Sequence, residues 1–183
     1  MMKTAVFLIT GFEEIEAVTP VDILRRGGVE VTTVSLTGEL VVSGSHGIEI
    51  VADALFDPAV DFDILILPGG PGTKYYHKYK EFLKKLELHH AQGKMLAAIC
   101  AAPTVLGSLG LLKNKKATCF PSMESELNAG ELTRAPVVTD GNITTSRSAA
   151  TALAFALELL TRAADANTTQ EIARQIVLEN YRD

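Results

Sequence analysis

One cysteine stands where its side chain could act as a nucleophile. Met95–Ile99 is a short, continuously apolar run that follows Gly93, so it is predicted to be a buried strand. Residues 101–112 are predicted to form a helix with Pro103 in the first turn, where its missing N–H does no harm. Cys100 would then occupy a sharp strand-to-helix turn, where the helix N-terminus favours a reactive thiolate. The alternative is a buried core cysteine that ends a strand.

A pair of glycines could supply hydrogen-bond donors beside this cysteine. Gly69 and Gly70 follow an apolar strand predicted over residues 63–67. Ligands of open parallel sheets bind beyond the carboxyl ends of the strands. The glycine loop and the turn at Cys100 would therefore face one pocket. Without a Cβ, the two glycine N–H groups can approach a ligand and, with that of Ala101, form an oxyanion hole. A tight turn without further function explains the same glycines.

The first predicted helix, residues 13–26, begins with three glutamates. The helix dipole stabilises Glu13 and Glu14 whatever the function. Glu16 differs because its neighbours Ile15 and Ala17 place it in an apolar stretch. Burial beside a thiolate would raise the pKa of Glu16 and keep the carboxyl protonated. Such a group could hydrogen-bond the sulfur and move a proton during turnover.

None of the four histidines follows Cys100 in the chain, which excludes triads whose base comes after the cysteine. His77 lies close after the glycine turn and is predicted either to reach the pocket or to lie on the surface. His89 and His90 are predicted to lie on a solvated helix face rich in Lys and Glu. His46 falls in a hairpin loop, exposed or at a subunit contact.

The composition excludes several classes of protein. The 183 residues, 47% hydrophobic and 21% charged, predict one globular domain over residues 1–183. The net charge of −5, with dispersed basic residues, disfavours a nucleic-acid partner. No run approaches the ~18 apolar residues of a membrane span. Cys100 and Cys119 form neither a disulfide framework nor a metal motif, which predicts a cytoplasmic protein without a metal, and Cys119 is expected to be a core residue.

Strand and helix patterns alternate along the chain. Strands are predicted over residues 4–9, 29–36, 63–67, 95–99, 116–119, 137–138 and 143–145, with a small hairpin over 40–42 and 48–51. Helices are predicted over residues 13–26, 78–91, 101–112, 149–163 and 168–179, the last with a capping box of Thr168 and Glu171. This alternation predicts an α/β sandwich around a mainly parallel sheet.

Four segments carry a resemblance to a known family. They are GFEEIEAVTPVDILRR over residues 11–26, LILPGG over 65–70, AAICAAP over 97–103 and TTSR over 144–147. The first and third together are specific, and the resemblance covers nearly the whole chain. The sequence resembles the DJ-1/ThiJ/PfpI superfamily, nearest to the branch of DJ-1 and the bacterial ThiJ-like (YajL-like) proteins.

The resemblance implies a flavodoxin-like three-layer α/β sandwich, a homodimer, and an easily oxidised cysteine beside a protonated glutamate, with no cofactor. Cys100 takes the nucleophile position and Glu16 the glutamate position. Gly69, Gly70 and Ala101 take the positions of the backbone donors.

The chain also departs from its relatives around this pocket. The peptidase-like PfpI branch carries a histidine directly after the cysteine, where this chain has Ala101, so proteolysis is disfavoured. Phe120 falls where DJ-1 has a histidine, and His46 where it has an arginine. We expect His46, Phe120 and Arg26 to contact the substrate or a partner subunit.

The dimer is expected to use the apolar side of the helix over residues 17–24. Asp22 could form an ion pair with Arg25 or Arg26 on the same helix, at spacings of three and four residues.

Two functions share this predicted pocket. The first is a cofactor-free glyoxalase or deglycase that acts on methylglyoxal, glyoxal or their early glycation adducts. The alternative is a redox-sensing stress protein or chaperone in which Cys100 is oxidised to a sulfinic acid. An older association of ThiJ-named proteins with thiamine synthesis finds no support, because the chain has no phosphate-binding loop of the kinase type.

Overall fold

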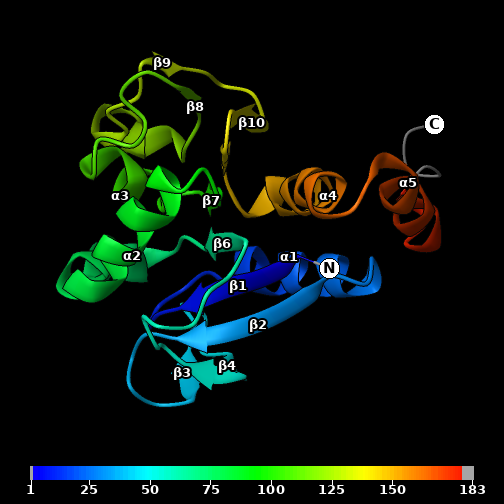
Figure 1. Ribbon diagram of the computed structural model, residues 1–183, viewed down its shortest axis with the longest axis horizontal. Helices are drawn as coiled ribbons and strands as arrows, with labels where there is room; N and C mark the ends of the chain where they lie inside the picture. The colour runs from blue at the N-terminus through cyan, green and yellow to red at the C-terminus, as the bar shows by residue number, and fades with distance from the viewer. Residues whose placement is uncertain (1, 179–183) are drawn as a thin grey trace.

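A computed structural model describes residues 2–178 (Figure 1). Seven strands form the central sheet: β1 (Lys3–Leu8), β2 (Glu30–Ser35), β5 (Ala54–Leu55), β6 (Ile64–Leu67), β7 (Met95–Ile99), β10 (Val137–Asp140) and β11 (Ile143–Ser146). Their spatial order is β10-β11-β7-β6-β1-β2-β5. Every neighbouring pair is parallel except β10 and β11, which confirms the mainly parallel sheet.

The innermost strands are continuously apolar because both faces of the sheet are covered. All four residues of β6 are buried, as are the last five of β1 and the last four of β7. Such runs are typical of parallel strands with helices on each side. They form the centre of the hydrophobic core and end together at one edge of the sheet.

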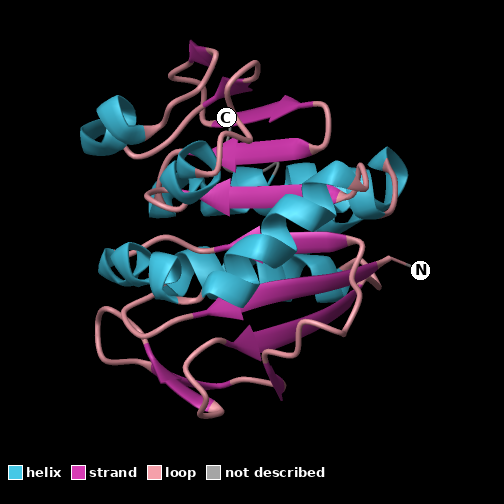
Figure 2. Ribbon diagram, turned by 60° about the vertical axis from the view of Figure 1, so that its left-hand side comes forward, coloured by secondary structure: helices cyan, strands magenta, loops and turns pink. Residues whose placement is uncertain are grey.

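Helices flank the sheet and complete the predicted three-layer sandwich (Figure 2). The α-helices are α1 (Glu14–Arg26), α2 (Lys80–Ala91), α3 (Pro103–Ser108), α4 (Ala152–Ala163) and α5 (Ala166–Gln175), and the 3-10 helices are η1 (Pro71–Lys78), η2 (Pro121–Glu126) and η3 (Ala149–Thr151). Helix α1 packs against α4, while α2 and α3 lie against β7. Among the described residues, no helix combines the length and apolarity needed to cross a membrane.

The predicted hairpin is confirmed as the antiparallel pair β3 (Val41–Ser43) and β4 (Glu49–Val51). Its turn is tied to the segment before α1, because the Gly11 N–H donates to the Ser43 carbonyl over 2.8 Å. The Ser45 N–H likewise donates to the Phe12 carbonyl, also over 2.8 Å. The hairpin turn is thereby held beside the glutamates that begin α1.

Several predicted boundaries were wrong. Helix α3 ends at Ser108 rather than at residue 112, and Gly110 follows it with φ +74°. The predicted strand over residues 116–119 is shorter, since β8 (Lys116–Ala117) pairs only with β9 (Glu131–Leu132), which was not predicted.

The start of α5 also differs from the prediction. Asp165 caps this helix, because its carboxylate accepts the Thr168 N–H over 2.8 Å, so the predicted capping box of Thr168 and Glu171 is wrong. Thr168 lies inside the helix and its N–H is the group that is capped. The predicted end of this helix, residue 179, lies outside the described residues.

Candidate active site

Cys100 occupies a strained turn between β7 and α3. Its φ is +65°, a conformation that non-glycine residues rarely adopt and that persists only where the surroundings enforce it. Two backbone hydrogen bonds hold the turn: the Cys100 N–H donates to the Ser146 carbonyl (2.9 Å), and the Phe120 N–H donates to the Cys100 carbonyl (2.8 Å). The sharp strand-to-helix turn predicted for a nucleophile elbow is therefore present.

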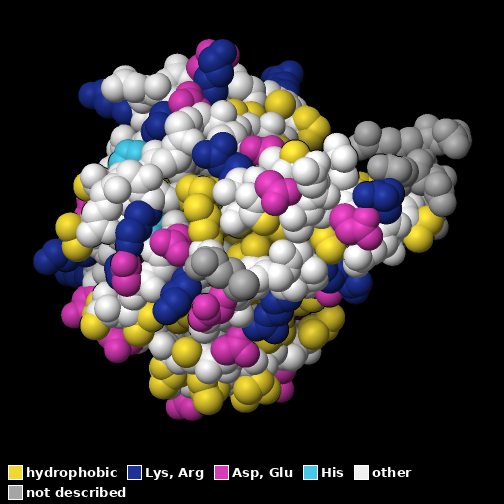
Figure 3. Space-filling view, turned by 45° about the vertical axis from the view of Figure 1, so that its right-hand side comes forward, with side chains coloured by type: hydrophobic (Ala, Val, Ile, Leu, Met, Phe, Trp, Pro, Cys, Tyr) yellow, Lys and Arg dark blue, Asp and Glu magenta, His cyan; other side chains and the backbone are white. Residues whose placement is uncertain are grey.

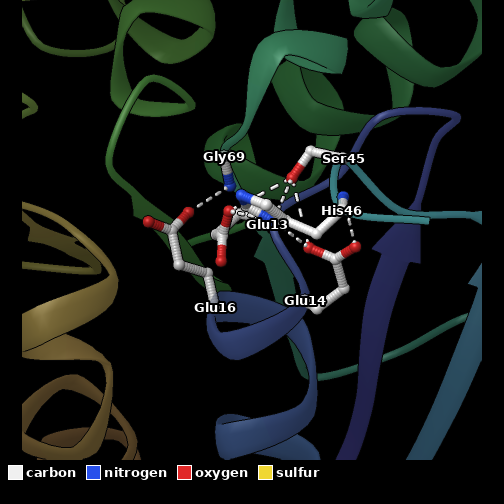
Figure 4. A network of polar contacts seen from close by, with 6 residues as sticks. All are labelled: Glu13, Glu14, Glu16, Ser45, His46 and Gly69. Carbon is white, nitrogen blue, oxygen red and sulfur yellow. Dashed lines mark hydrogen bonds and ion pairs between the residues drawn. The ribbon is translucent and has the colours of Figure 1, made fainter. Parts of the chain in front are cut away.

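Glu16 projects from the first turn of α1 into the same region and is 1% exposed. The Gly69 N–H donates to its Oε2 over 2.9 Å (Figure 4). A Cβ at Gly69 would lie 2.7 Å from both that oxygen and the Cys100 Cβ. Glycine at this position therefore allows the loop after β6 to close on the glutamate and the cysteine together.

The cysteine and the glutamate share one titration. Burial raises the pKa of Glu16 to about 7, although the Cys100 thiol and the Gly69 N–H act in the opposite direction. Burial, together with the Glu16 charge, raises the pKa of Cys100 to about 12. The expectation that the helix dipole favours a free thiolate is thus wrong, because burial and then the Glu16 charge favour the thiol. The thiolate becomes accessible when Glu16 takes up the proton, so the pair acts as one acid–base unit.

The three predicted backbone donors have different roles. The N–H of Gly69 is occupied by Glu16, so Gly69 positions the carboxyl rather than a substrate oxygen. The N–H groups of Gly70 and Ala101 interact with the Cys100 sulfur and lower its pKa, in opposition to burial. Gly70 has φ +96°, a conformation that glycine adopts without strain. These two N–H groups can receive negative charge that develops beside the sulfur.

A second polar cluster, formed by Glu13, Glu14, Ser45 and His46, lies next to Glu16 and Gly69 (Figure 4). Glu14 accepts the His46 backbone N–H over 2.7 Å and contacts the His46 Nδ1 over 2.9 Å. The Ser45 hydroxyl lies 3.2 Å from Glu13 Oε2 and 3.1 Å from Glu14 Oε2. Burial opposes ionisation of Glu14, but the contacts from His46 and Ser45 prevail and lower its pKa to about 2. The hydrogen bond with Glu14 and the charges of Glu13 and Glu14 raise the pKa of His46.

Possible metal ligands also meet in this cluster, which the sequence did not predict. Atoms of Glu13, Glu14 and His46 that could bind a cation lie within 4.8 Å of one another. The hydrogen bonds within the cluster already account for this arrangement, and His46 is 70% exposed. The geometry therefore assigns the cluster to anchoring the hairpin on α1.

A cleft of about 1320 Å³ opens over the cysteine. The predicted residues that line it are Cys100, Glu16, Gly70, Ala101, His46, His77 and Phe120. Among the further lining residues, sequence reasoning did not identify one group: Thr104, Val105, Ser108, Ser122, Met123, Ser125 and Asn128. They come from α3 and the segment around η2, which carry no motif. Pro121 was the one sequence signal for this segment, because a proline restricts the backbone of the residue before it, here Phe120.

Three other expectations are resolved away from the cleft. Arg26 is not among the lining residues, since its Nε forms the predicted ion pair with Asp22 (2.8 Å) on the exposed side of α1. Cys119 is fully buried, as expected for a core residue. The solvated position predicted for His89 is wrong: it is 1% exposed, and its Nε2 lies 3.0 Å from the Met95 carbonyl oxygen.

Comparisons with known proteins agree with this geometry. The model of the DJ-1/PfpI family matches residues 2–162. Protein dj-1beta of Drosophila melanogaster is 38% identical, over 97% of this chain and 98% of its own length. Protein DJ-1 homolog B of Arabidopsis thaliana is 36% identical over 96% of this chain, which spans only 41% of that longer protein.

An archaeal relative and a solved structure extend the comparison. Deglycase PH1704 of Pyrococcus horikoshii is 32% identical, over 87% of this chain and 98% of its own length. The structure of oxidized Toxoplasma gondii DJ-1 superposes with a TM-score of 0.93 at 34% identity, covering 97% of this chain and 98% of that one. The family model matches most of this chain, and the chain has the fold of a solved DJ-1 structure. This chain therefore belongs to the DJ-1/PfpI family.

Proposed function

We propose that the protein is a cofactor-free glyoxalase that converts 2-oxoaldehydes to 2-hydroxy acids, with related activity on early glycation adducts. The observation that carries this proposal is the pairing of half-buried Cys100 with buried Glu16, a nucleophile and an acid–base group that meet at the Gly69 loop. The similarity to a protein named a deglycase supports a carbonyl substrate. A role in protection from carbonyl or oxidative stress follows from such an activity.

The reaction begins at the sulfur. The Glu16 carboxylate takes the thiol proton while the Cys100 sulfur forms a bond to the aldehyde carbon of the substrate. The N–H groups of Gly70 and Ala101 stabilise the resulting oxyanion until Glu16 returns the proton, which gives a hemithioacetal. Glu16 must be ionised at the start, so the rate is expected to rise with pH through about 7.

The second half of the reaction moves hydrogen within the substrate. Glu16 removes the proton from the former aldehyde carbon and delivers it to the neighbouring carbon. The hydroxyl proton on the first carbon passes to the oxygen of the second, whose carbonyl becomes a hydroxyl. The first carbon is oxidised to the level of a thioester and the second is reduced, so no external oxidant or cofactor is needed. Water then cleaves the thioester, which releases the 2-hydroxy acid and the Cys100 thiol.

The test is to incubate the protein with methylglyoxal, without glutathione, and to measure D- and L-lactate separately. We expect lactate from the wild type and its loss in Cys100→Ser and Glu16→Gln. Cys119→Ala is the matched control, because it removes the other cysteine, which does not line the cleft. Absence of lactate from folded, reduced wild type, or full turnover by Cys100→Ser, contradicts the proposal.

A redox function is the second candidate, favoured by the free, half-buried state of Cys100 beside two backbone N–H groups. Two molecules of peroxide would oxidise the thiol to a sulfinic acid and be reduced to water. A related protein from Toxoplasma gondii is described as oxidized. Peroxide titration followed by intact mass should add two oxygen atoms to the wild type and none to Cys100→Ser. An unchanged wild-type mass contradicts this function.

We also propose a homodimer, on a surface that only partly coincides with the predicted one. Within residues 17–24, Ala17, Ile23 and Leu24 are buried in the core and are not available, whereas Val18 is exposed. The exposed apolar residues of α1 are Ile15 and Val18, 54% and 48% exposed. Hydrophobic side chains also gather at the end of the molecule that carries the hairpin (Figure 3), where Leu40, Val41, Ile48 and Val51 are exposed. Sedimentation showing only monomer contradicts the dimer.

A further inference from the structure

Phe120 is the exposed member of the seven phenylalanines in this chain. Phe120 is 40% exposed, whereas the other six are buried or half-buried. It lines the same cleft as Cys100 and Glu16. Leaving a large apolar ring in water forfeits the roughly 25 cal/mol per Å² that burial would contribute. An exposed aromatic ring on a concave wall is typical of a ligand site.

The backbone holds Phe120 in a fixed position relative to the nucleophile. Its N–H donates to the carbonyl of Cys100 over 2.8 Å, and its carbonyl accepts the N–H of Met123 over 2.8 Å. Pro121 follows it and restricts its backbone, which is extended at φ −59° and ψ 136°. Phe120 is therefore built into the wall beside Cys100.

Other apolar side chains line the cleft together with Phe120. Val105, Leu83 and Met123 line the same cleft, and a methionine sulfur makes favourable contacts with aromatic rings. The cleft, about 1320 Å³, exceeds the roughly 300–1,000 Å³ that is typical of sites for drug-sized ligands. A three-carbon aldehyde such as methylglyoxal would fill only a small part of this cleft.

We propose that Phe120 forms a subsite for an aromatic ring on the substrate, so that aryl-substituted 2-oxoaldehydes are preferred over methylglyoxal. The inference rests on the proposed glyoxalase function and adds a substrate class to it. The aldehyde carbon bonds to the Cys100 sulfur while the aryl group on the adjacent ketone packs against Phe120. With phenylglyoxal, addition, hydrogen transfer and hydrolysis as described above consume one water and give mandelate.

The experiment compares kcat/KM for phenylglyoxal and methylglyoxal in the wild type, Phe120→Leu and Phe120→Ala. Loss of an aromatic contact should lower the phenylglyoxal-to-methylglyoxal ratio about two- to twelvefold in Phe120→Ala and less in Phe120→Leu. Leu88→Ala is the control, since it removes an apolar side chain that is 52% exposed on α2 and does not line the cleft. An unchanged ratio in Phe120→Ala overturns the inference.

A binding measurement separates this inference from the glyoxalase proposal. Mandelate and lactate are each tested for protection of Cys100 from alkylation by iodoacetamide, which requires no turnover. Stronger protection by mandelate in the wild type, lost in Phe120→Ala, supports the aromatic subsite even if neither aldehyde is turned over. That absence of turnover would overturn the glyoxalase function alone. Equal protection by the two acids, or protection that persists in Phe120→Ala, overturns the subsite.

Discussion

Glu14 and Glu16 leave the first turn of α1 with only Ile15 between them, and both are buried, yet their surroundings differ (Figure 4). Glu14 meets the ring and backbone of His46 and the hydroxyl of Ser45, which lower its pKa to about 2 despite burial. Glu16 receives the Gly69 N–H and faces a thiol, and burial raises its pKa to about 7.

The comparison shows that burial alone does not decide the charge of a carboxyl. Partners that favour the charged form make Glu14 a permanent anion that anchors the hairpin. With fewer such partners, Glu16 titrates near neutral pH and can exchange a proton with Cys100. Two glutamates on one helical turn thus separate into a structural and a reactive group.

The largest expected effect comes from the two glycines that abut these carboxyls. In Gly69→Ala the new Cβ would lie 2.7 Å from Glu16 Oε2 and from the Cys100 Cβ, so the pair must move apart. A shift of that order costs about 100-fold in turnover, measured as lactate formed from methylglyoxal. In Gly44→Ala the Cβ meets the Glu14 carboxyl instead.

Gly44→Ala is therefore expected to lower the free energy of unfolding, measured in urea, and to retain more activity than Gly69→Ala. Equal loss of activity in the two variants would break the comparison, because the two carboxyls would then act as one unit.

Glu16→Gln should stabilise the protein at alkaline pH while it removes activity. The folded-state pKa of Glu16 is raised from 4.5 to about 7, so its stability contribution is complete below pH 4.5 and is lost as pH rises through 7. Without that ionisation, the variant should be more stable than the wild type by on the order of 2 kcal/mol at pH 8. Urea unfolding at pH 4 and pH 8 measures the difference, and identical pH slopes for the two proteins would refute it.

His89 tests whether a shifted pKa identifies a functional group. It is buried on α2 and does not line the cleft, and burial lowers its pKa to about 4. Stability should be complete above pH 6.5 and fall by on the order of 2 kcal/mol as pH decreases towards 4, since only the unfolded state takes up the proton. Thermal unfolding of His89→Gln should show a weaker acid dependence with lactate formation retained. A loss of turnover would instead connect His89 to the site.

Glu14→Gln is expected to have the smallest effect. The pKa of Glu14 is lowered from 4.5 to about 2, so its contribution is complete above pH 4.5 and is lost as pH falls through 2. Solvent around the exposed His46 screens the interaction, so the variant should lose about 1 kcal/mol at pH 7. Unfolding at pH 7 and pH 2.5 measures this loss, which should shrink at the lower pH. A variant with unaltered stability at pH 7 would remove the anchoring role of Glu14.

Local sequence signals determined much of this protein. Continuous apolar runs identified β1, β6 and β7, because strands covered on both faces have no polar side. The run that ends at Cys100, followed by small residues and Pro103, predicted the elbow. The apolar neighbours of Glu16 predicted its burial and its raised pKa.

Contacts between distant segments were decided only by the tertiary structure. Three such contacts join residues that are 20 or more positions apart in the chain. Gly69 donates to Glu16, His46 contacts Glu14, and the Phe120 N–H donates to the Cys100 carbonyl. The thiolate expected from the helix N-terminus is disfavoured by burial of Cys100 and by the charge of Glu16, and helix periodicity reports neither. Hydrogen bonding and desolvation act through space, so residue order alone predicts which groups are near a strand end but not which of them share a proton.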